Sequence, residues 1–329
     1  MKRLAIIGAG AWGTALALVA RRAGTTPVLC ARDPEIAGAI NRRHENPAYL
    51  PGIGLDPAIV ATIDTAAAVE KADAALFVVP AQFLRAVLHR LRPVLPVGLP
   101  VLHCAKGIET GSLAMMSQIG AELLPASPFA VLSGPSFAAE VARDLPTAVT
   151  IASADPKLAE CFLGALAGGR FRPYLSADPV GAEIGGAVKN VLAIACGIVV
   201  GRGLGDNARA ALITRGLAEM VRLGVACGAQ AETFRGLCGL GDLVLSCSTG
   251  QSRNHALGLA LGRGRSLGAA LGGRRSVVEG VATATAVAAL AARHGIEMPI
   301  SAAVDAVLHR GVAIDAMTEG LLRRPYRSE

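Results

Sequence analysis

The feature that most constrains this sequence is a glycine-rich segment near the N-terminus. Gly8-Ala9-Gly10-Ala11-Trp12-Gly13 has the spacing GxGxxG, follows the apolar run Leu4–Ile7 and opens the apolar helical stretch Trp12–Ala23. GxGxxG alone is a weak signal, but a strand before it and a helix after it form the context in which the motif binds a dinucleotide. The first glycine permits a tight turn, the second lets a pyrophosphate approach the backbone, and the third lets the helix pack closely on the strand. The sequence therefore predicts a dinucleotide-binding unit, with a glycine-rich turn that binds no ligand as the alternative.

The first half of the chain alternates short apolar runs with helical patterns such as Ala81–Leu91 and Leu113–Leu124. This alternation predicts right-handed βαβ units around a parallel sheet, and runs that are apolar throughout indicate strands covered on both faces. Thr147–Ile151 and Phe171–Leu175 are expected to add strands to the same sheet. The five apolar runs that we interpret as strands are Leu4–Ile7, Val28–Cys30, Ala74–Val79, Leu99–Cys104 and Phe129–Leu132.

The pattern changes at about Asp178. Beyond Ser176-Ala177-Asp178-Pro179, strand signals are few, and long segments rich in alanine, leucine and glycine have helical length. We therefore predict a Rossmann-type α/β domain over residues 1–178 that binds the dinucleotide, followed by an all-α domain over residues 179–329 that carries substrate-binding and catalytic residues. The predicted helical segments are Ala182–Val200, Ala208–Leu223, Ala282–Arg293 and Ala302–Leu308.

Composition argues against nucleic-acid binding. The formal net charge is +7 and aromatic residues make up 3% of the chain. The positive charge is scattered, with no run of five basic residues and no aromatic residues interleaved for base stacking. Only five of the 32 basic residues are lysines, so a lysine inside a motif merits attention.

The cysteines and the apolar stretches of the sequence indicate in which cellular compartment the protein is expected. The seven cysteines show no CxxC spacing and several lie in apolar stretches, which is typical of reduced, buried thiols in a cytoplasmic protein and predicts no metal site. Lys2-Arg3 before an apolar stretch resembles the start of a signal peptide, but three glycines interrupt that stretch. We find no uninterrupted apolar span of about 20 residues and predict no transmembrane helix.

The residue at the end of the second apolar run bears on the choice of cofactor. Arg32 lies where an acidic residue would bind the ribose 2′-hydroxyl of NAD and an arginine would pair with the 2′-phosphate of NADP. Asp33 precedes Pro34 and is predicted to cap the next helix. The sequence therefore favours NADPH and leaves NADH open, with a solvated surface position for Arg32 as the alternative.

Six further segments carry a resemblance to a known family. They are Cys104–Glu109, Leu132–Ala138, Gly185–Val191, Gly239–Leu243, Gln251–Asn254 and Val277–Gly280. Together with the glycine-rich segment they resemble bacterial NAD(P)-dependent glycerol-3-phosphate dehydrogenase, in the same order and at matching spacings from residue 4 to about residue 300.

The resemblance implies a chemical role for one lysine. Lys189 matches the family's catalytic lysine, and reduction of a ketone needs a proton donor at the carbonyl oxygen. A surface lysine is the alternative. Asp242 is the expected carboxylate partner of Lys189 or a ligand of a substrate hydroxyl, with an ordinary helix cap as the alternative. The substrate-binding residues that the resemblance implies are Lys106, Gly134, Ser136, Lys189, Asp242, Ser252, Arg253 and Asn254.

Two residues match the family's phosphate-binding pair. The guanidinium group of Arg253 fits a phosphate with two parallel hydrogen bonds, and the amide of Asn254 adds a neutral donor. The segment Ser252–Leu261 is predicted to be helical, so its N-terminal N–H groups are also expected to face the anion. The six histidines match no catalytic position, and most are expected at surfaces or helix ends. The cofactor-binding residues that the resemblance implies are Gly8, Gly10, Ala11, Trp12, Gly13, Arg32, Tyr49, Lys106, Ala138, Arg253, Val277 and Glu279.

These observations together predict an enzyme. The resemblance implies reversible reduction of dihydroxyacetone phosphate to sn-glycerol 3-phosphate with NAD(P)H, which feeds glycerophospholipid synthesis. We expect a cytoplasmic protein whose partners are a small phosphate substrate and a nicotinamide cofactor, with neither nucleic acid nor a membrane span. The resemblance and the helices rich in alanine and glycine suggest a homodimer.

Two alternative functions stay open at this point. One is another two-domain dehydrogenase of the β-hydroxyacid type, against which the Arg253-Asn254 pair and the Cys104–Glu109 segment argue. The other is a non-catalytic NAD(P)-sensing protein, which would not need Lys106, Lys189, Asp242 and Arg253 together.

Overall fold

The structure, a computed structural model, describes residues 1–273 and 277–325. The chain divides into two compact units. Unit 1 comprises Met1–Lys106 and Ala114–Glu183, and unit 2 comprises Gly107–Leu113 and Ile184–Glu329. The predicted boundary between residues 178 and 179 falls at the start of helix α8 (Pro179–Gly201), and the units divide a few residues further along this helix.

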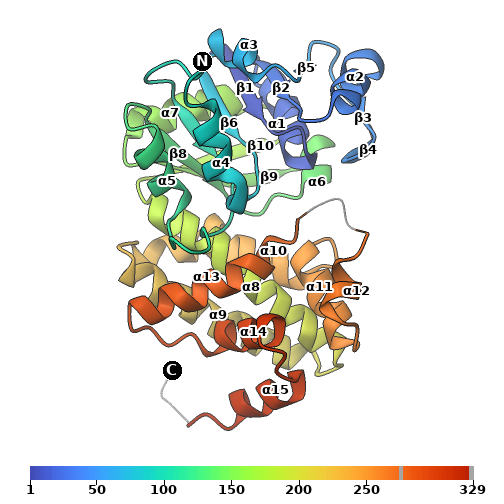
Figure 1. The fold of residues 1–329 in the computed structure, drawn as a ribbon, viewed down its shortest axis with the longest axis vertical. Coiled ribbons are helices and arrows are strands. Elements are labelled where there is room, and N and C mark those ends of the chain that lie inside the picture. Colours follow the sequence, from blue (N-terminus) through green and yellow to red (C-terminus); the bar gives the residue numbers. More distant parts are fainter. Residues whose placement is uncertain (274–276, 326–329) are drawn as a thin grey trace. The chain divides into compact units, whose positions relative to one another are not determined.

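Unit 1 is built on an eight-stranded sheet with the order β10-β9-β8-β7-β6-β1-β2-β5. Figure 1 shows this sheet among its helices. All of the runs that were interpreted as strands lie in this sheet. Its strands are β1 (Arg3–Ile7), β2 (Thr26–Cys30), β5 (Val60–Thr62), β6 (Ala74–Phe77), β7 (Val101–His103), β8 (Phe129–Ser133), β9 (Thr147–Ala152) and β10 (Phe171–Ser176).

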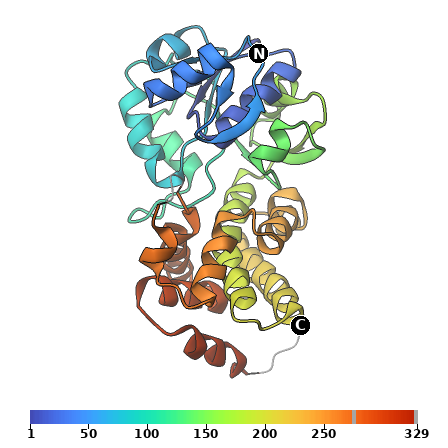
Figure 2. The ribbon, with the colours of Figure 1, turned by 90° about the vertical axis from the view of Figure 1, so that its right-hand side faces the viewer.

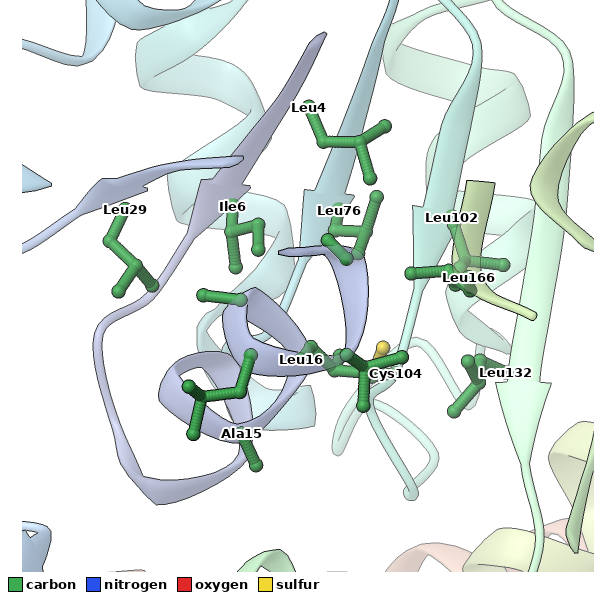
Figure 3. Close-up of a cluster of buried hydrophobic side chains, with 14 of the residues drawn as sticks. Leu4, Ile6, Ala15, Leu16, Leu29, Leu76, Leu102, Cys104, Leu132 and Leu166 are labelled. Atoms are coloured by element: carbon green, nitrogen blue, oxygen red, sulfur yellow. The ribbon is translucent and has the colours of Figure 1, made fainter. Parts of the chain in front are cut away.

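Helices cover both faces of the sheet, as the uniformly apolar strands predict. Side chains of β1 alternate between two buried clusters, so Leu4 and Ile6 pack with α1 while Ala5 and Ile7 pack with α4. Figure 3 shows side chains of the first cluster, among them Leu4 and Ile6 from β1 and Leu16 from α1. The helices in contact with the first cluster are α1 (Ala11–Arg22), α2 (Pro34–Arg43), α6 (Ala138–Ala142) and α7 (Pro156–Leu166), and those in contact with the second are α3 (Thr65–Glu70), α4 (Ala81–Leu91) and α5 (Met116–Leu123).

One strand pair departs from the predicted parallel sheet. β9 pairs with β8 in the antiparallel direction, with Leu132 opposite Ile151, and β10 then pairs parallel to β9. Both strands therefore join the same sheet, as expected, but β9 runs antiparallel to β8 instead of continuing the parallel arrangement. For β9 to run parallel to β8, the chain between them would have to cross back along the whole length of the sheet. The segment that joins β8 to β9 contains only the five-residue helix α6.

Three short strands were not predicted. β3 (Glu45–Asn46) and β4 (Leu50–Gly54) form an antiparallel pair, and β5 is an edge strand beside β2. None of them contains an apolar run, because their residues are buried only in part. Pattern reading finds strands through continuous or alternating apolar residues, which these segments do not offer.

From Ile184 onward, the described residues of unit 2 contain helices and no strand, so the predicted order of an α/β region followed by an all-α region is confirmed (Figure 2). The helices are α8 (Pro179–Gly201), α9 (Asp206–Ala226), α10 (Asp242–Ser248), α11 (Arg253–Gly262), α12 (Leu267–Leu271), α13 (Glu279–Arg293), α14 (Pro299–His309) and α15 (Ile314–Leu322), with a 3₁₀ turn η1 (Ala231–Arg235) and a π-helical turn η2 (Leu237–Gly241).

Glycines set two of these helices unusually close together. Gly197 and Gly201 of α8 face Gly258 and Gly262 of α11, with four residues from one glycine to the next on each helix. A Cβ at Gly197 would lie 2.1 Å from a backbone carbonyl oxygen of α11, and a Cβ at Gly258 would lie 2.0 Å from one of α8. Only glycine fits at such a contact, so the composition of these segments determines how closely α11 lies against α8.

Helix α8 is long and apolar enough to cross a membrane by length and composition alone. Most of it is buried inside the protein, however, which is the environment of a core helix. It also carries the buried ionisable residues Glu183 and Lys189, each of which has a partner within the fold.

Candidate active site

The three glycines of the GxGxxG segment have different surroundings. Gly8 has φ +118°, and a Cβ at this position would lie 2.5 Å from the carbonyl oxygen of Val78. A Cβ at Gly13 would lie 1.9 Å from the carbonyl oxygen of Gly8, because the first turn of α1 packs directly on the backbone of the glycine turn. Gly10, the N-cap of α1, has nothing within 4 Å of its Cβ position. Gly8 and Gly13 thus serve the turn and the helix packing, while the Cβ position of Gly10 is open at the N-terminus of α1, where the first N–H groups of a helix have no partner within the helix.

Predicted site residues of unit 1 follow strands that run in the same direction. Gly8, Arg32, Lys106 and Gly134 come after β1, β2, β7 and β8, which are parallel neighbours or joined through parallel β6. The carboxyl ends of these strands therefore share one edge of the sheet, where open α/β sheets bind ligands. Arg32 is exposed at this edge.

The carbonyl group of Gly134 holds two other predicted site residues in place. Lys106 Nζ and Ser136 Oγ each donate a hydrogen bond of 2.9 Å to this oxygen. Gly134 itself has φ +128°, and a Cβ there would lie 3.0 Å from Cα of Val149. The turn after β8 therefore requires glycine, and its carbonyl orients Lys106, which follows β7, and Ser136, which lies two residues after Gly134.

The remaining predicted cofactor residues of unit 1 lie at the starts of helices and in one loop. Ala11 and Trp12 form the first turn of α1, and Ala138 begins α6. The backbone N–H of Tyr49 donates to Oδ1 of Asn46, which is fully buried. The resemblance placed Asn46 and Tyr49 in one loop beside the nicotinamide, but a loop has no periodic signal from which the burial of Asn46 or its bonds could be predicted.

Burial also changes the chemistry of a thiol next to this region. Desolvation raises the pKa of Cys104 to about 12, although a hydrogen bond with Trp12 and the charge of Lys106 act in the opposite direction. The thiol is therefore neutral at physiological pH and is no nucleophile.

In unit 2, the predicted catalytic lysine makes a buried ion pair. Lys189 Nζ donates to Oδ1 of Asp242 at 2.8 Å and to Oγ of Ser246 at 2.9 Å. The exposed fractions of Lys189 and Asp242 are 8% and 1%. The carboxylate compensates a positive charge that would be costly to bury alone, and the two acceptors direct the ammonium group. Ser246 was missed, although it lies four residues after Asp242 and therefore on the same face of α10.

The predicted phosphate-binding residues lie at the start of α11. Ser252 caps this helix, since its Oγ accepts from the backbone N–H of His255, and Arg253 is exposed. Asn254 is buried: its Oδ1 accepts from the backbone N–H of Gly280 at 3.0 Å, and its Nδ2 donates to Oδ1 of Asn190 at 2.8 Å. The Nδ2 group of Asn254 has a second hydrogen besides the one that it donates to Asn190, and this N–H donor suits an anion.

The structure brings some of the predicted residues of unit 2 together. Asn190 directly follows Lys189, so its bond to Asn254 places the start of α11 beside the lysine cluster. Glu279 is the first residue of α13 and precedes Gly280, which contacts Asn254. Val277 is exposed before this helix, and residues 274–276 next to it lie outside the described part of the chain.

Two histidines are buried, although only His103 departs from the expected positions at surfaces and helix ends. His103 lies in β7 with no exposed surface, and its Nε2 is 3.1 Å from Oε1 of Glu183. His255 is buried in the first turn of α11, where burial, followed by the charge of Arg209, lowers its pKa. Within residues 1–273 and 277–325, no group of three or more His, Cys, Asp or Glu side chains is placed to hold a metal ion.

Comparison with known proteins covers nearly the whole chain. The family model described as NAD-dependent glycerol-3-phosphate dehydrogenase N-terminus matches residues 3–159, and the model of the C-terminus matches residues 178–319. This chain belongs to the NAD-dependent glycerol-3-phosphate dehydrogenase family. The glycerol-3-phosphate dehydrogenase [NAD(P)+] of Rhodospirillum rubrum is 60% identical over 99% of this chain and 93% of its own length. That of Caulobacter vibrioides is 57% identical over 100% of this chain and 99% of its own.

A solved structure of a glycerol-3-phosphate dehydrogenase supports the same assignment. The crystal structure of the enzyme from Coxiella burnetii is 41% identical, has a TM-score of 0.94, and covers 98% of this chain and 99% of its own. As a glycerol-3-phosphate dehydrogenase family member, the chain is expected to use a nicotinamide cofactor, and unit 1 fits one. The open space at Gly10 and the N-terminus of α1 would receive the pyrophosphate.

Proposed function

We propose that this chain interconverts dihydroxyacetone phosphate and sn-glycerol 3-phosphate with a nicotinamide cofactor. The observation that carries the proposal is the buried cluster of Lys189, Asp242 and Ser246 in a member of this dehydrogenase family. A buried, doubly anchored lysine is unusual outside a functional site, because burial of an ammonium group costs free energy that packing alone does not return.

Lys189 moves the proton in this proposal. The cofactor supplies or accepts the hydride at the substrate carbon. Lys189 donates a hydrogen bond to the carbonyl oxygen during reduction and protonates the alkoxide that forms, and in oxidation it removes the hydroxyl proton. Asp242 and Ser246 hold the ammonium group in one direction, so little reorientation is needed when charge develops on the substrate oxygen.

The start of α11 binds the phosphate group in this proposal. Arg253 supplies a guanidinium group, Asn254 a neutral N–H donor, and the first turn of α11 its unpaired backbone N–H groups. Lys106, Gly134 and Ser136 are further proposed substrate contacts, and Lys106 is also a proposed contact of the cofactor.

The same proposal includes the individual cofactor contacts and the preference for one cofactor. Residues 1–178 bind the dinucleotide, residues 179–329 carry the catalytic lysine, and Arg32 pairs with a 2′-phosphate, so that NADPH is preferred to NADH. Val277 and Glu279 contact the cofactor together with Arg253, and the other cofactor contacts are Gly8, Gly10, Ala11, Trp12, Gly13, Tyr49 and Ala138. The protein acts in the cytoplasm, as a homodimer, and its product feeds glycerophospholipid synthesis.

The direct test is oxidation of NADPH and NADH by the purified protein with dihydroxyacetone phosphate. Lys189→Ala should lower kcat by a factor of about 10²–10⁴, the usual contribution of a positioned general acid. Lys157→Ala, which removes an exposed lysine of α7, should leave kcat unchanged and serves as the matched control. Undiminished turnover by Lys189→Ala would exclude Lys189 from proton transfer.

The same assay separates the alternative functions. Turnover of non-phosphorylated hydroxyacids with no turnover of dihydroxyacetone phosphate would identify a dehydrogenase of the β-hydroxyacid type. Binding of NADPH without turnover of any keto-phosphate would instead identify a cofactor sensor.

A further inference from the structure

Asn46 is a fully buried polar residue of unit 1, and the proposed chemical step does not use it. It is the last residue of the two-residue strand β3, lies in a segment that looks like a polar loop, and has no exposed surface. Its Nδ2 donates to the carbonyl oxygen of Ala9 at 3.0 Å and to Oγ1 of Thr14 at 2.8 Å, while its Oδ1 accepts from the backbone N–H of Tyr49 at 3.3 Å. Both amide hydrogens and the oxygen are therefore used.

The orientation of this amide follows from its partners. The carbonyl group of Ala9 can only accept, and the backbone N–H of Tyr49 can only donate, so the nitrogen of Asn46 must face Ala9 and its oxygen must face Tyr49. Aspartate has the same shape but no N–H donor, and leucine has neither donor nor acceptor. The three contacts together require the amide of asparagine.

These three partners all belong to the cofactor-binding part of unit 1. Ala9 lies between Gly8 and Gly10 of the glycine turn, and Thr14, fully buried, lies in the first turn of α1, where its N–H closes that turn on the carbonyl of Gly10. Tyr49 is one of the proposed cofactor contacts. A single side chain thus joins the glycine turn, the first turn of α1 and the Tyr49 segment.

The bond to Ala9 also sets the direction of an N–H group. The carbonyl of Ala9 and the N–H of Gly10 belong to one planar trans peptide and point in opposite directions. The hydrogen bond from Asn46 keeps the carbonyl of Ala9 pointing toward Asn46. The N–H of Gly10 therefore points away from Asn46. Gly10 has open space around its Cβ position, which is the region that receives the pyrophosphate in the proposed function.

We infer that Asn46 is a positioning residue for the nicotinamide cofactor, which orients the pyrophosphate-binding N–H of Gly10 and ties Tyr49 to the same turn. The inference rests on the proposed function for the identity of the ligand. It concerns cofactor affinity and not the chemical step, since Asn46 bonds to none of the substrate-binding or catalytic residues.

The test compares two asparagines that use their amides alike. Asn41 of α2 bonds through both its amide nitrogen and its oxygen to the backbone of Ala61 in β5, each at 2.8 Å, and makes no bond to the glycine turn. Equilibrium titration of the cofactor-free protein with NADPH, followed by fluorescence, gives the Kd directly. We expect Asn46→Leu to raise the Kd by about tenfold, the loss expected for buried hydrogen bonds left without partners. Asn41→Leu should leave the Kd unchanged even if it lowers the melting temperature.

A steady-state assay provides the second readout. With saturating NADPH, kcat of Asn46→Leu should stay within about twofold of the wild-type value while KM for NADPH rises with the Kd. An unchanged Kd in Asn46→Leu, an equal rise in both leucine variants, or a loss of kcat at saturation with unchanged KM would each overturn the inference.

A milder pair of variants decides the matter if Asn46→Leu does not fold. Thr14→Val removes one acceptor of the Asn46 amide and Thr14→Ser retains it. The Kd should rise in the valine variant and remain near the wild-type value in the serine variant, and equal values for all three proteins would overturn the inference. Wild-type protein that binds NADPH without reducing dihydroxyacetone phosphate would contradict the proposed substrate, and the titration would still decide the role of Asn46.

Discussion

At the scale of single residues, the polar side chains of the candidate site are held before any ligand arrives. Lys106 is held by the carbonyl of Gly134, Lys189 by Asp242 and Ser246, and Asn254 by the backbone N–H of Gly280. Groups that are fixed in this way lose little conformational entropy when substrate binds, and they need little rearrangement as charge develops. The donors thus have defined directions, which a flexible surface lysine would lack.

The glycine turn allows a ligand effect to be separated from a folding effect. Gly10→Ala should fold with nearly the wild-type melting temperature, because φ is −76° and nothing lies within 4 Å of the new methyl group. It should weaken NADPH binding by about tenfold or more, since the methyl group enters the space for the pyrophosphate. Gly13→Ala should instead lower the melting temperature, because its Cβ would lie 1.9 Å from the carbonyl oxygen of Gly8. Thermal unfolding and NADPH titration of both variants check this, and an unstable Gly10→Ala would contradict it.

At the scale of elements, the close contact of α8 and α11 relates Lys189 to the start of α11. Lys189 and Asn190 lie on α8, Arg253 and Asn254 lie on α11, and four glycines form the contact between the two helices. A larger residue at this contact would separate the helices along their length. Helix packing within unit 2 therefore sets the distance between Lys189, the proposed proton donor, and the proposed phosphate-binding residues at the start of α11.

Gly258→Ala is expected to destabilise unit 2. The added methyl group would overlap a backbone carbonyl of α8, and overpacking of this kind costs about 1–3 kcal/mol. Gly320→Ala in α15 is the matched control, since its Cβ position is open and alanine is the better helix former by up to about 1 kcal/mol. Urea unfolding followed by circular dichroism measures both. A Gly258→Ala protein as stable as the control would show that α8 and α11 are not in the contact described.

The start of β1 depends on a carboxylate. The backbone N–H groups of Lys2 and Arg3 both donate to Asp73, which precedes β6, and these bonds hold the pKa of Asp73 below its usual value. A folded-state pKa below the unfolded value gives stability that is present above the unfolded pKa and is lost as the pH falls through the folded pKa. Asp73→Asn should therefore lower the melting temperature slightly at pH 7, and the difference should disappear in acid. A difference that stays constant from pH 7 to about pH 2 would contradict this assignment.

At the scale of the whole molecule, the cysteines behave as core residues. All seven are free thiols, and five of them are buried. Burial raises the pKa of Cys30 and of Cys104 to about 12, so neither is a thiolate at neutral pH. The expectation of reduced, buried thiols therefore fits most of the seven, with Cys161 on α7 as the exposed exception.

Thiol alkylation should follow this order of exposure. Iodoacetamide added to the native protein at pH 7.5 should modify Cys161 first and Cys227 more slowly, because Cys227 is half-buried and burial raises its pKa. The other five should react only after unfolding. Peptide mass spectrometry identifies the modified positions, and early modification of Cys104 would show that the region beside Trp12 and Lys106 opens in solution.

Much of the molecule could be predicted from local pattern. The glycine turn, most strands of the sheet, the change to helices near Asp178 and the pairing of Lys189 with Asp242 all follow from short segments and from the family resemblance. Local sequence carries this information because a strand or helix buries a periodic set of side chains, and because a tight turn needs glycine whatever surrounds it.

Other features could not be read in this way. Three features depend on residues that are distant in the chain. They are the antiparallel pairing of β9 with β8, the burial of His103 and His255, and the three hydrogen bonds of Asn46. None of these positions has a periodicity of its own, since each is defined by what packs against it.

The sequence by itself determined the type of most long elements, the glycine turn between β1 and α1, and the lysine and carboxylate that form the buried pair. The tertiary structure alone decided which distant groups meet, such as Asn46 with Ala9 and α8 with α11. The physical reason is that helix and strand preferences act between near neighbours in the chain, whereas burial, hydrogen-bond partners and close backbone contacts exist only once the folded chain has brought distant segments together.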